Sequence, residues 1–381
     1  MVKFSENVTN IIEANSIHYN NIVYELKKEG HDIIVLSLGE AYFNLPLFSF
    51  EDLPFPDIYH YSHSRGIIEL RNKLSNYFKK HYDFKFDAEK EIIVTAGSKA
   101  AIQMSFMSIL NPGDEVIIFE PYWVSYTEQV KLCYSNPITV PYYQNVFNVE
   151  DYLTEKTKCI VLNNPHNPTG KIYNKEEIEH LIKVAIKNNI YILSDEAYSD
   201  FVPDHKTFHS LGKFQNMENT ITVNSISKNY GISGWRLGYV ITNEALINQI
   251  LKINQHIITC PSTILEYYIA KHFDEIIRIT KPQIKKVVMG RAKVCQYLNS
   301  KGLDYFEGDA AWYIFLSIEK SKLTSEEFCT ELLKKHHVCC VPGIGYGKTC
   351  DKFIRVCVGS EPWNRITKGI DIIRNLIDDT S

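Results

Sequence analysis

The feature that most constrains the fold is the alternation of short apolar runs with longer segments of helical spacing. Six runs, most of them rich in Ile and Val, lead into polar or glycine-containing residues: 91–94, 115–119, 159–162, 190–193, 220–223 and 237–241. Short, largely apolar runs are typical of strands buried between layers of helices. Segments with helical spacing, such as 100–110 and 175–188, separate most of them. The alternation predicts an α/β fold with a mainly parallel sheet.

The pattern changes toward the C-terminus, where a long helical segment, 283–298, leads into shorter strand-like pieces. The start of the chain adds a helix over 21–28 and an extended run. A chain of 381 residues is long enough for two domains. We therefore expect a central α/β domain over 46–281 and a smaller domain built from both ends, 1–45 and 282–381.

Composition and charge exclude several classes of protein. The formal net charge is −4, which gives no reason to expect nucleic acid or an anionic membrane as a partner. No stretch approaches the roughly 20 apolar residues of a membrane span, and the start lacks the apolar core of a signal peptide. The nine cysteines are spaced neither as a zinc site nor as a disulfide scaffold. We expect a cytoplasmic protein with reduced thiols and no metal.

Lys228 is the first candidate for chemistry. It follows the run 220–223 within a segment of small residues, and Arg236 comes eight positions later. An amine that attacks a carbonyl must lose its proton, and partial burial beside a second cation lowers the pKa of a lysine. Small neighbours let a bulky aromatic cofactor approach the backbone. The alternative is a solvated lysine in a surface loop.

Asp195 and Tyr198 follow another run, 190–193. Open α/β sheets bind ligands at the carboxyl ends of their strands. A carboxylate buried there needs a cationic partner, and a protonated pyridine nitrogen would serve. The alternatives are a helix N-cap for Asp195 and an ordinary core position for Tyr198.

Three further runs also end in residues that could bind a ligand. The turn after 159–162 contains two prolines and a glycine and presents Asn167, whose amide could donate to a phenolate oxygen. Gly97, Ser98 and Lys99 precede a helix, whose first amide groups favour an anion. Trp123 offers an aromatic face. The alternatives are a turn whose Asn binds its own backbone, a simple tight turn, and an interfacial tryptophan.

In this order, the segments resemble those of the class I/II aminotransferases of the aspartate aminotransferase superfamily, the fold type I pyridoxal 5′-phosphate (PLP) enzymes. The bacterial-type aspartate/aromatic subgroup is the most similar. The resemblance covers about 37–359 and is carried by Ser-x-Ser-Lys…Gly-Trp-Arg-Leu-Gly at 225–238, Asn-Pro-Thr-Gly at 167–170 and Asp-x-x-Tyr at 195–198. It implies a mainly parallel seven-stranded sheet flanked by helices and a smaller α+β domain. It also implies amino-group transfer between an α-amino acid and a 2-oxo acid.

The resemblance assigns roles around PLP residue by residue. Lys228 matches the lysine that forms the Schiff base and moves the proton between the substrate and the cofactor. Asp195 matches the partner of the pyridine nitrogen, while Tyr198 and Asn167 match the ligands of the phenolate oxygen. Trp123 matches the ring that stacks on the cofactor. The implied phosphate ligands are Gly97, Ser98, Lys99, Ser225 and Arg236.

Three more matches concern the substrate and a second subunit. Arg355 matches the arginine that holds the substrate α-carboxylate through a bidentate pair. Gly39 belongs to the loop over that carboxylate. Tyr61 matches a tyrosine that reaches the phosphate in the neighbouring subunit, so the resemblance implies a homodimer.

The chain departs from the family pattern beside the substrate. Family members usually continue Gly-Glu with Pro-Asp-Phe, whereas residues 41–46 here read Ala-Tyr-Phe-Asn-Leu-Pro. We expect Tyr42 to narrow the side-chain pocket or make it more aromatic, and no basic residue can be placed to bind a distal carboxylate. A PLP-dependent β-lyase or eliminase on the same fold remains an alternative. A PLP-binding regulator is disfavoured, because only about 36 residues precede the resemblance.

Overall fold

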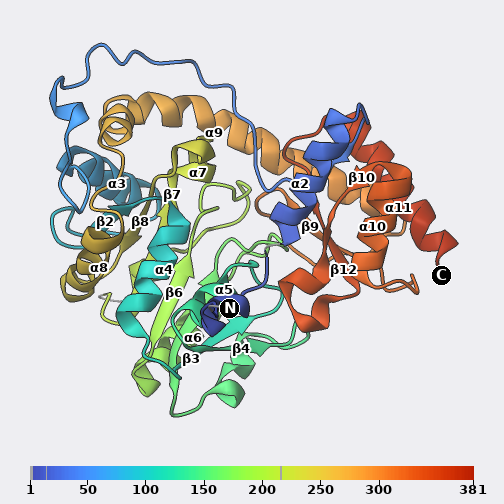
Figure 1. Cartoon of the computed structure of the whole chain (residues 1–381), viewed down its shortest axis with the longest axis horizontal. Helices are drawn as coiled ribbons and strands as arrows, with labels where there is room; N and C mark the ends of the chain where they lie inside the picture. Colours follow the sequence, from blue (N-terminus) through green and yellow to red (C-terminus); the bar gives the residue numbers. More distant parts are fainter. Residues whose placement is uncertain (1–2, 14, 215–216) are drawn as a thin grey trace.

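The computed structural model describes residues 3–13, 15–214 and 217–381. Met1 and Val2, at the start expected to lack a signal peptide, lie outside these residues. A seven-stranded sheet with its helices forms one side of the molecule (Figure 1). The C-terminal elements, together with helix α2 (Asn15–Lys28), form the other side.

The seven-stranded sheet confirms the predicted α/β class. Its order is β2-β8-β7-β6-β5-β3-β4, and every neighbouring pair is parallel except the two that involve β8. The strands are β2 (Ile92–Thr95), β3 (Glu115–Phe119), β4 (Asn136–Val140), β5 (Thr157–Asn163), β6 (Tyr191–Asp195), β7 (Thr220–Ser225) and β8 (Gly238–Ile241). All six predicted runs are strands. The pattern missed β4, because this edge strand is only partly buried and therefore less apolar.

Helices cover both faces of the sheet because successive strand residues point to opposite sides. On β3, Val116 and Ile118 pack toward one cluster, whereas Ile117 and Phe119 pack toward another. The first cluster includes α4 (Ser98–Ile109), α5 (Tyr126–Leu132) and α8 (Glu244–Ile257), and the second includes α6 (Lys175–Asn188). Helix α6 begins with a capping box in which Asn174 and Glu177 satisfy each other's backbone N–H groups.

Polar residues at the ends of several strands lie together at one edge of this sheet. Asn163 at the end of β5 pairs in register with Asp195 at the end of β6. On the antiparallel strand β8, Gly238 lies opposite both Thr95 of β2 and Ser225 of β7. The carboxyl ends of β2, β5, β6 and β7 therefore meet at the edge where open α/β sheets bind ligands.

The other side of the molecule is built from both ends of the chain, as expected. Strand β1 (Ile34–Val35) pairs with β10 (Val338–Cys339), and an antiparallel sheet has the order β11-β12-β9. Its strands are β9 (Tyr313–Ser317), β11 (Val341–Pro342) and β12 (Phe353–Cys357), and its helices are α2, α10 (Ser325–His336) and α11 (Trp363–Asp379). The domain boundaries proposed from the sequence stay a prediction.

Helix α9 (Thr263–Ser300) corrects the helix expected over 283–298. It is one continuous helix of 38 residues that contains Pro282, and it runs across the molecule from the seven-stranded sheet to the C-terminal elements (Figure 1). Helix α3 (Ile68–His81) packs against it. The change of pattern near Pro282 therefore marks a position inside a helix rather than the start of one.

Two further observations concern the expected environment of the chain. Among the described residues, no helix is both long enough and apolar enough to span a membrane. All nine cysteines are free thiols, and eight of them are buried. In those eight positions the thiols serve as small apolar side chains.

Candidate active site

A cavity of about 230 Å³ lies at this edge of the sheet, between it and strands β9 and β12. Its lining residues come from loops that are far apart in the sequence. The lining residues predicted from the sequence are Gly39, Ser98, Lys99, Trp123, Asn167, Asp195, Tyr198, Ser225, Lys228, Arg236 and Arg355. The structure therefore brings nearly all the predicted site residues together.

Two predicted residues do not line the cavity. Gly97 has φ +86°, and a Cβ atom at this position would come 2.6 Å from the Arg236 Nη2 atom. Tyr61 is 85% exposed and lies outside the cavity of this chain. Tyr42 is also exposed, at 67%, and is not a lining residue. The expected narrowing of the pocket by Tyr42 is therefore not seen.

Sequence reasoning missed a second set of lining residues, which comprises Asn20, Val124, Asn163, Ala197, Ser227, Ser233 and Tyr313. Asn163, at the last position of β5, could have been found by the strand-end argument that singled out Asp195. Tyr313 carries no such signal, because it is one of two aromatic residues in a buried strand.

Lys228 reaches the cavity from the short helix α7 (Ile226–Asn229). Ser225 caps this helix by accepting a hydrogen bond from the Ser227 N–H group. The Lys228 Nζ atom donates to the Gly39 carbonyl oxygen at 2.5 Å. Burial lowers the pKa of Lys228 to about 8, while the charge of Glu40 opposes this shift. The amine is therefore easier to deprotonate than an ordinary lysine, as a nucleophile requires.

Asp195 is a buried carboxylate held by neutral donors. The Tyr126 hydroxyl donates to its Oδ2 atom at 2.7 Å, and the Ala197 N–H group donates to Oδ1 at 3.2 Å. Burial raises the pKa of Asp195, and these hydrogen bonds oppose the increase. No cation of the described residues lies within ion-pair distance of it. Such a carboxylate fits a protonated ring nitrogen.

The Tyr198 hydroxyl lies at the centre of a small hydrogen-bond network. The Asn167 amide donates to it at 3.4 Å, and the Tyr313 hydroxyl is 2.8 Å away. The Tyr313 hydroxyl in turn donates to the Gly39 carbonyl at 3.2 Å. The Asn167 side chain does not bind its own backbone, so the alternative of a self-satisfied turn does not hold. The network instead places two potential donors, on Asn167 and Tyr198, side by side at the cavity wall.

Arg355 is a buried cation, only 3% exposed. One guanidinium nitrogen donates to the Ser37 carbonyl at 2.7 Å, and another approaches the Asn167 side-chain oxygen at 3.4 Å. The aromatic rings of Tyr313 and Tyr346 lie 4.9 and 5.4 Å from its central carbon. The Nε atom has no hydrogen-bond partner. A guanidinium that lines a cavity and has no carboxylate partner among the described residues suits a carboxylate ligand.

The opposite end of the cavity is cationic. Ser98 is the first residue of α4, so the amide groups that begin this helix face the same region. Arg236 and Lys99 also line this end, and the Lys99 Nζ atom lies 5.3 Å from the centre of the Trp123 ring. The charged lining residues comprise four cations, on Lys99, Lys228, Arg236 and Arg355, and one carboxylate, on Asp195. The cavity therefore suits a ligand with more than one anionic group.

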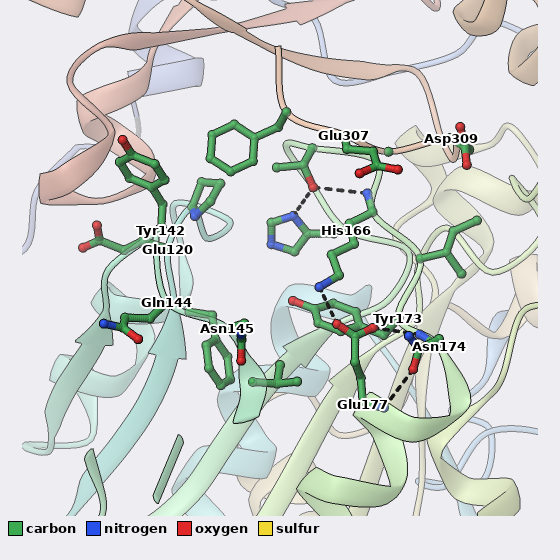
Figure 2. Close-up of a pocket in the computed structure, with 18 of the residues that line it drawn as sticks. Glu120, Tyr142, Gln144, Asn145, His166, Tyr173, Asn174, Glu177, Glu307 and Asp309 are labelled. Atoms are coloured by element: carbon green, nitrogen blue, oxygen red, sulfur yellow. Dashed lines mark hydrogen bonds and ion pairs between the residues drawn. The ribbon is translucent and has the colours of Figure 1, made fainter. Parts of the chain in front are cut away.

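A second cavity, of about 420 Å³, is lined by His166 and other residues of the turn after β5 (Figure 2). Its charged groups are largely paired with each other or with backbone groups. The Lys171 ammonium contacts Glu177 at 2.6 Å, and the Glu120 carboxylate accepts backbone N–H groups from Lys348 and Thr349. These groups have little unused capacity for a ligand, so we take the first cavity as the candidate active site.

Comparison with known proteins identifies the family of the chain. The family model for aminotransferase class I and II matches residues 50–367. An aspartate aminotransferase of Pyrococcus abyssi is 34% identical over 338 residues, which cover 85% of this chain and 87% of that protein. Aromatic-amino-acid aminotransferase 2 of Thermococcus litoralis is 32% identical over 347 residues, 88% of this chain and 89% of that protein. The solved structure of aspartate aminotransferase from Thermus thermophilus with maleate has a TM-score of 0.90 at 26% identity and covers 99% of this chain and 100% of that chain.

The fold is thus α/β, and the cavity at the sheet edge holds the Lys228 amine together with the cationic side chains of Lys99, Arg236 and Arg355. The chain belongs to the class I and II aminotransferases. It moves an amino group between an α-amino acid and a 2-oxo acid, and its family uses PLP. The function predicted from the sequence is confirmed at this level.

Proposed function

We propose that this chain binds PLP through Lys228 and uses the cavity at the sheet edge for transamination. The observation that carries the proposal is that a lysine of lowered pKa and a buried guanidinium without a carboxylate partner among the described residues line the same cavity. A cofactor alone would not require Arg355. An enzyme that also binds the carboxylate of a substrate does require such a residue.

The proposed contacts follow the chemistry of the lining residues. Ser98, Ser225 and Arg236, with the amide groups at the start of α4, would hold the phosphate. Lys99 and the tight turn at Gly97 would complete this end of the site. Asp195 would bind the ring nitrogen, Tyr198 and Asn167 would bind the phenolate oxygen, and Trp123 would cover the ring. When bound, PLP supplies an electron sink for the charge that develops at the substrate α-carbon.

The residues of this chain then control where the proton goes. Arg355 and the Gly39 loop orient the substrate carboxylate, which fixes the direction of the α-carbon–hydrogen bond. The Lys228 amine, when it is not bonded to the cofactor, would accept the proton from the substrate α-carbon and deliver it to the adjoining carbon atom of the cofactor. Its pKa of about 8 suits this role, because proton transfer is most efficient when the pKa lies near the working pH.

We further propose a homodimer in which Tyr61 completes the site of the neighbouring subunit. In support, Tyr61 is highly exposed. Its loop is nevertheless well anchored, because the Ser62 N–H group donates to the Thr263 hydroxyl at 3.1 Å and the Ser62 hydroxyl donates to Glu266 at 3.0 Å. An exposed tyrosine on a rigid loop is suited to contact a second chain.

The experiment that tests this function compares the wild-type protein with the Lys228→Ala variant. Wild type is expected to show a reducible PLP adduct and to form a new amino acid from a 2-oxo acid and an amino donor. The variant is expected to lose both. Retention of a reducible adduct in the variant contradicts the role of Lys228. Release of ammonia and pyruvate from a cysteine-type substrate by wild type, without a new amino acid, indicates elimination instead.

A further inference from the structure

Arg291, in the second half of α9, is a buried guanidinium without a carboxylate partner. It is 1% exposed, and no described residue forms an ion pair with it. Its donors bind three backbone carbonyls instead. Nε donates to the Tyr313 carbonyl at 2.9 Å, one terminal nitrogen donates to the Thr169 carbonyl at 3.1 Å, and the other donates to the Gly308 carbonyl. Burying a charge without an opposite charge beside it costs free energy, which indicates that Arg291 serves a function.

The three carbonyls belong to two segments that are far apart in the sequence. Thr169 lies in the turn after β5, whereas Gly308 and Tyr313 belong to the segment that enters β9. The two segments also meet directly, because the Gly170 carbonyl accepts the N–H groups of Asp309 and Ala310 at 3.0 and 2.9 Å. Arg291 lies over this junction and binds both sides of it.

The turn is also fixed on its opposite side. There the His166 Nδ1 atom lies 2.8 Å from the Thr169 hydroxyl, a contact seen in the second cavity (Figure 2). The turn is therefore held internally by His166 and against β9 by Arg291. The His166–Thr169 contact involves no residue that lines the candidate active site, whereas Arg291 binds the main-chain carbonyl of Tyr313, which does line it.

These two segments carry the two residues that contact the Tyr198 hydroxyl. Asn167 lies in the turn and Tyr313 begins β9, at 3.4 and 2.8 Å from the Tyr198 oxygen. Their relative position therefore depends on how the turn is placed against the strand. Arg291 binds the main chain of both segments but touches neither the Asn167 nor the Tyr198 side chain.

We propose that Arg291 is a positioning residue that acts on the active site through Asn167, Tyr313 and Tyr198. The proposal rests on the proposed function, in which Tyr198 and Asn167 bind the phenolate oxygen of PLP. A planar guanidinium with five N–H donors can span three carbonyls in fixed directions. A lysine at position 291 would offer one point charge and could not hold both segments in the same geometry.

A third cavity, beside Arg291, makes it possible to test this proposal by chemical rescue. It has a volume of about 460 Å³, and Arg291 lines it together with Met289, Cys295 and Tyr305. Shortening Arg291 to alanine would open space toward this cavity. Free guanidinium could then enter and replace the lost group.

The experiment uses the PLP-loaded enzyme with Arg291→Lys and Arg291→Ala, and Arg374→Lys as a matched control. Arg374 also donates to a backbone carbonyl, that of Lys301, but in a different part of the fold. The first readout is the pH midpoint of the absorbance of the lysine-bound cofactor. We expect it to rise by roughly half a unit or more in both Arg291 variants, because weaker donation to the phenolate makes the adjoining nitrogen more basic. We also expect kcat/KM to fall about tenfold or more, and millimolar guanidinium to restore both values in Arg291→Ala only.

Two additional variants separate positioning from simple loss of stability. In a Tyr198→Phe background, Arg291→Lys should cause no further shift of the pH midpoint, because the residue through which it acts is absent. Gly308→Ala keeps Arg291 but places a Cβ atom against the Thr169 carbonyl, and should shift the midpoint in the same direction. Gly308→Ala also provides the readout if the Arg291 variants do not fold.

The outcomes distinguish this inference from the proposed function. An unchanged midpoint and unchanged kcat/KM in folded Arg291→Lys overturn the inference alone, as does an additive shift in the Tyr198→Phe background. Absence of a lysine-bound cofactor in wild type overturns the proposed function and the inference with it.

Discussion

The hydroxyl oxygens of Tyr198 and Tyr313 lie 2.8 Å apart, although 115 positions separate the two residues in the sequence. Both side chains are buried at the wall of the candidate active site. Only one of the two was expected to take part in cofactor binding. At this distance Tyr313 is a hydrogen-bond partner of Tyr198. We therefore expect removal of either hydroxyl to lower kcat, but to different extents.

Tyr313→Phe is expected to lower kcat modestly, by roughly fivefold, because a hydrogen bond of this kind contributes about 1 kcal/mol. Tyr198→Phe should lower it more, since its hydroxyl is the proposed contact to the cofactor. Steady-state kinetics of both variants with one amino donor provide the measurement. A larger loss in Tyr313→Phe than in Tyr198→Phe would contradict this ranking.

The lowered pKa of Lys228 predicts how the cofactor-free protein captures PLP. Only the neutral amine attacks a carbonyl, and its fraction rises with pH through the pKa of about 8. The second-order rate of capture should therefore rise about tenfold from pH 7 to pH 9 and then level off. Stopped-flow absorbance measures this rate, and a small lysine derivative in solution is the control. A protein rate that continues to rise steeply beyond pH 9, as the control should, would contradict the lowered pKa.

Arg355→Lys should weaken substrate binding while leaving the cofactor in place. A lysine cannot reproduce the bidentate pair with a carboxylate, so KM for the amino donor should rise about 30-fold or more, equivalent to about 2 kcal/mol. The absorbance of bound PLP serves as the internal control, because the proposed cofactor contacts do not include Arg355. An unchanged KM would remove Arg355 from the substrate site.

Mixing two defective variants tests the proposed role of Tyr61. Lys228→Ala lacks the nucleophile, and Tyr61→Ala lacks the residue proposed to reach the neighbouring site. A hybrid dimer would contain one complete site, with Lys228 from one subunit and Tyr61 from the other. Random exchange should therefore restore about a quarter of wild-type activity. Activity no greater than that of the separate variants, with hybrid dimers shown to be present, would count against a shared site.

Glu266 predicts a pH dependence of stability. It accepts hydrogen bonds from Ser62 and from the Ile67 N–H group, and burial raises its pKa to about 7. Because the folded pKa lies above the unfolded one, the stabilisation is complete below about pH 4.5 and is lost as the pH rises through 7. Between pH 4.5 and pH 8, the free energy of unfolding of wild type should therefore fall by up to about 3 kcal/mol relative to that of Glu266→Gln.

Urea unfolding of the two proteins across this pH range measures the difference. Glu69→Gln, on the adjacent helix α3, is the matched control because Glu69 is exposed. A constant difference between wild type and Glu266→Gln would show that Glu266 does not titrate in this window.

Much of the fold and of the lining of the candidate site could be predicted from the sequence. Strands buried on both faces must be short and apolar, and ligands bind where parallel strands end, so Asp195 and Asn167 stood out by position. Lys228 and Arg236 stood out by their motif. Strand β4 and the continuity of α9 through Pro282 could not be predicted. An edge strand needs fewer apolar residues, and in a sequence a proline within a helix looks like a helix boundary.

The contacts of Tyr126, Arg291 and Tyr313 with the segments that form the candidate site are visible in the folded protein alone. Along the chain these residues are a tyrosine after a tryptophan, an arginine in a helix and an aromatic residue in a strand. Their partners lie 69, 122 and 115 positions away. Local spacing determines which elements form and which loops carry reactive groups. Contacts between distant elements, which depend on how the elements pack, determine which ordinary side chains orient those groups.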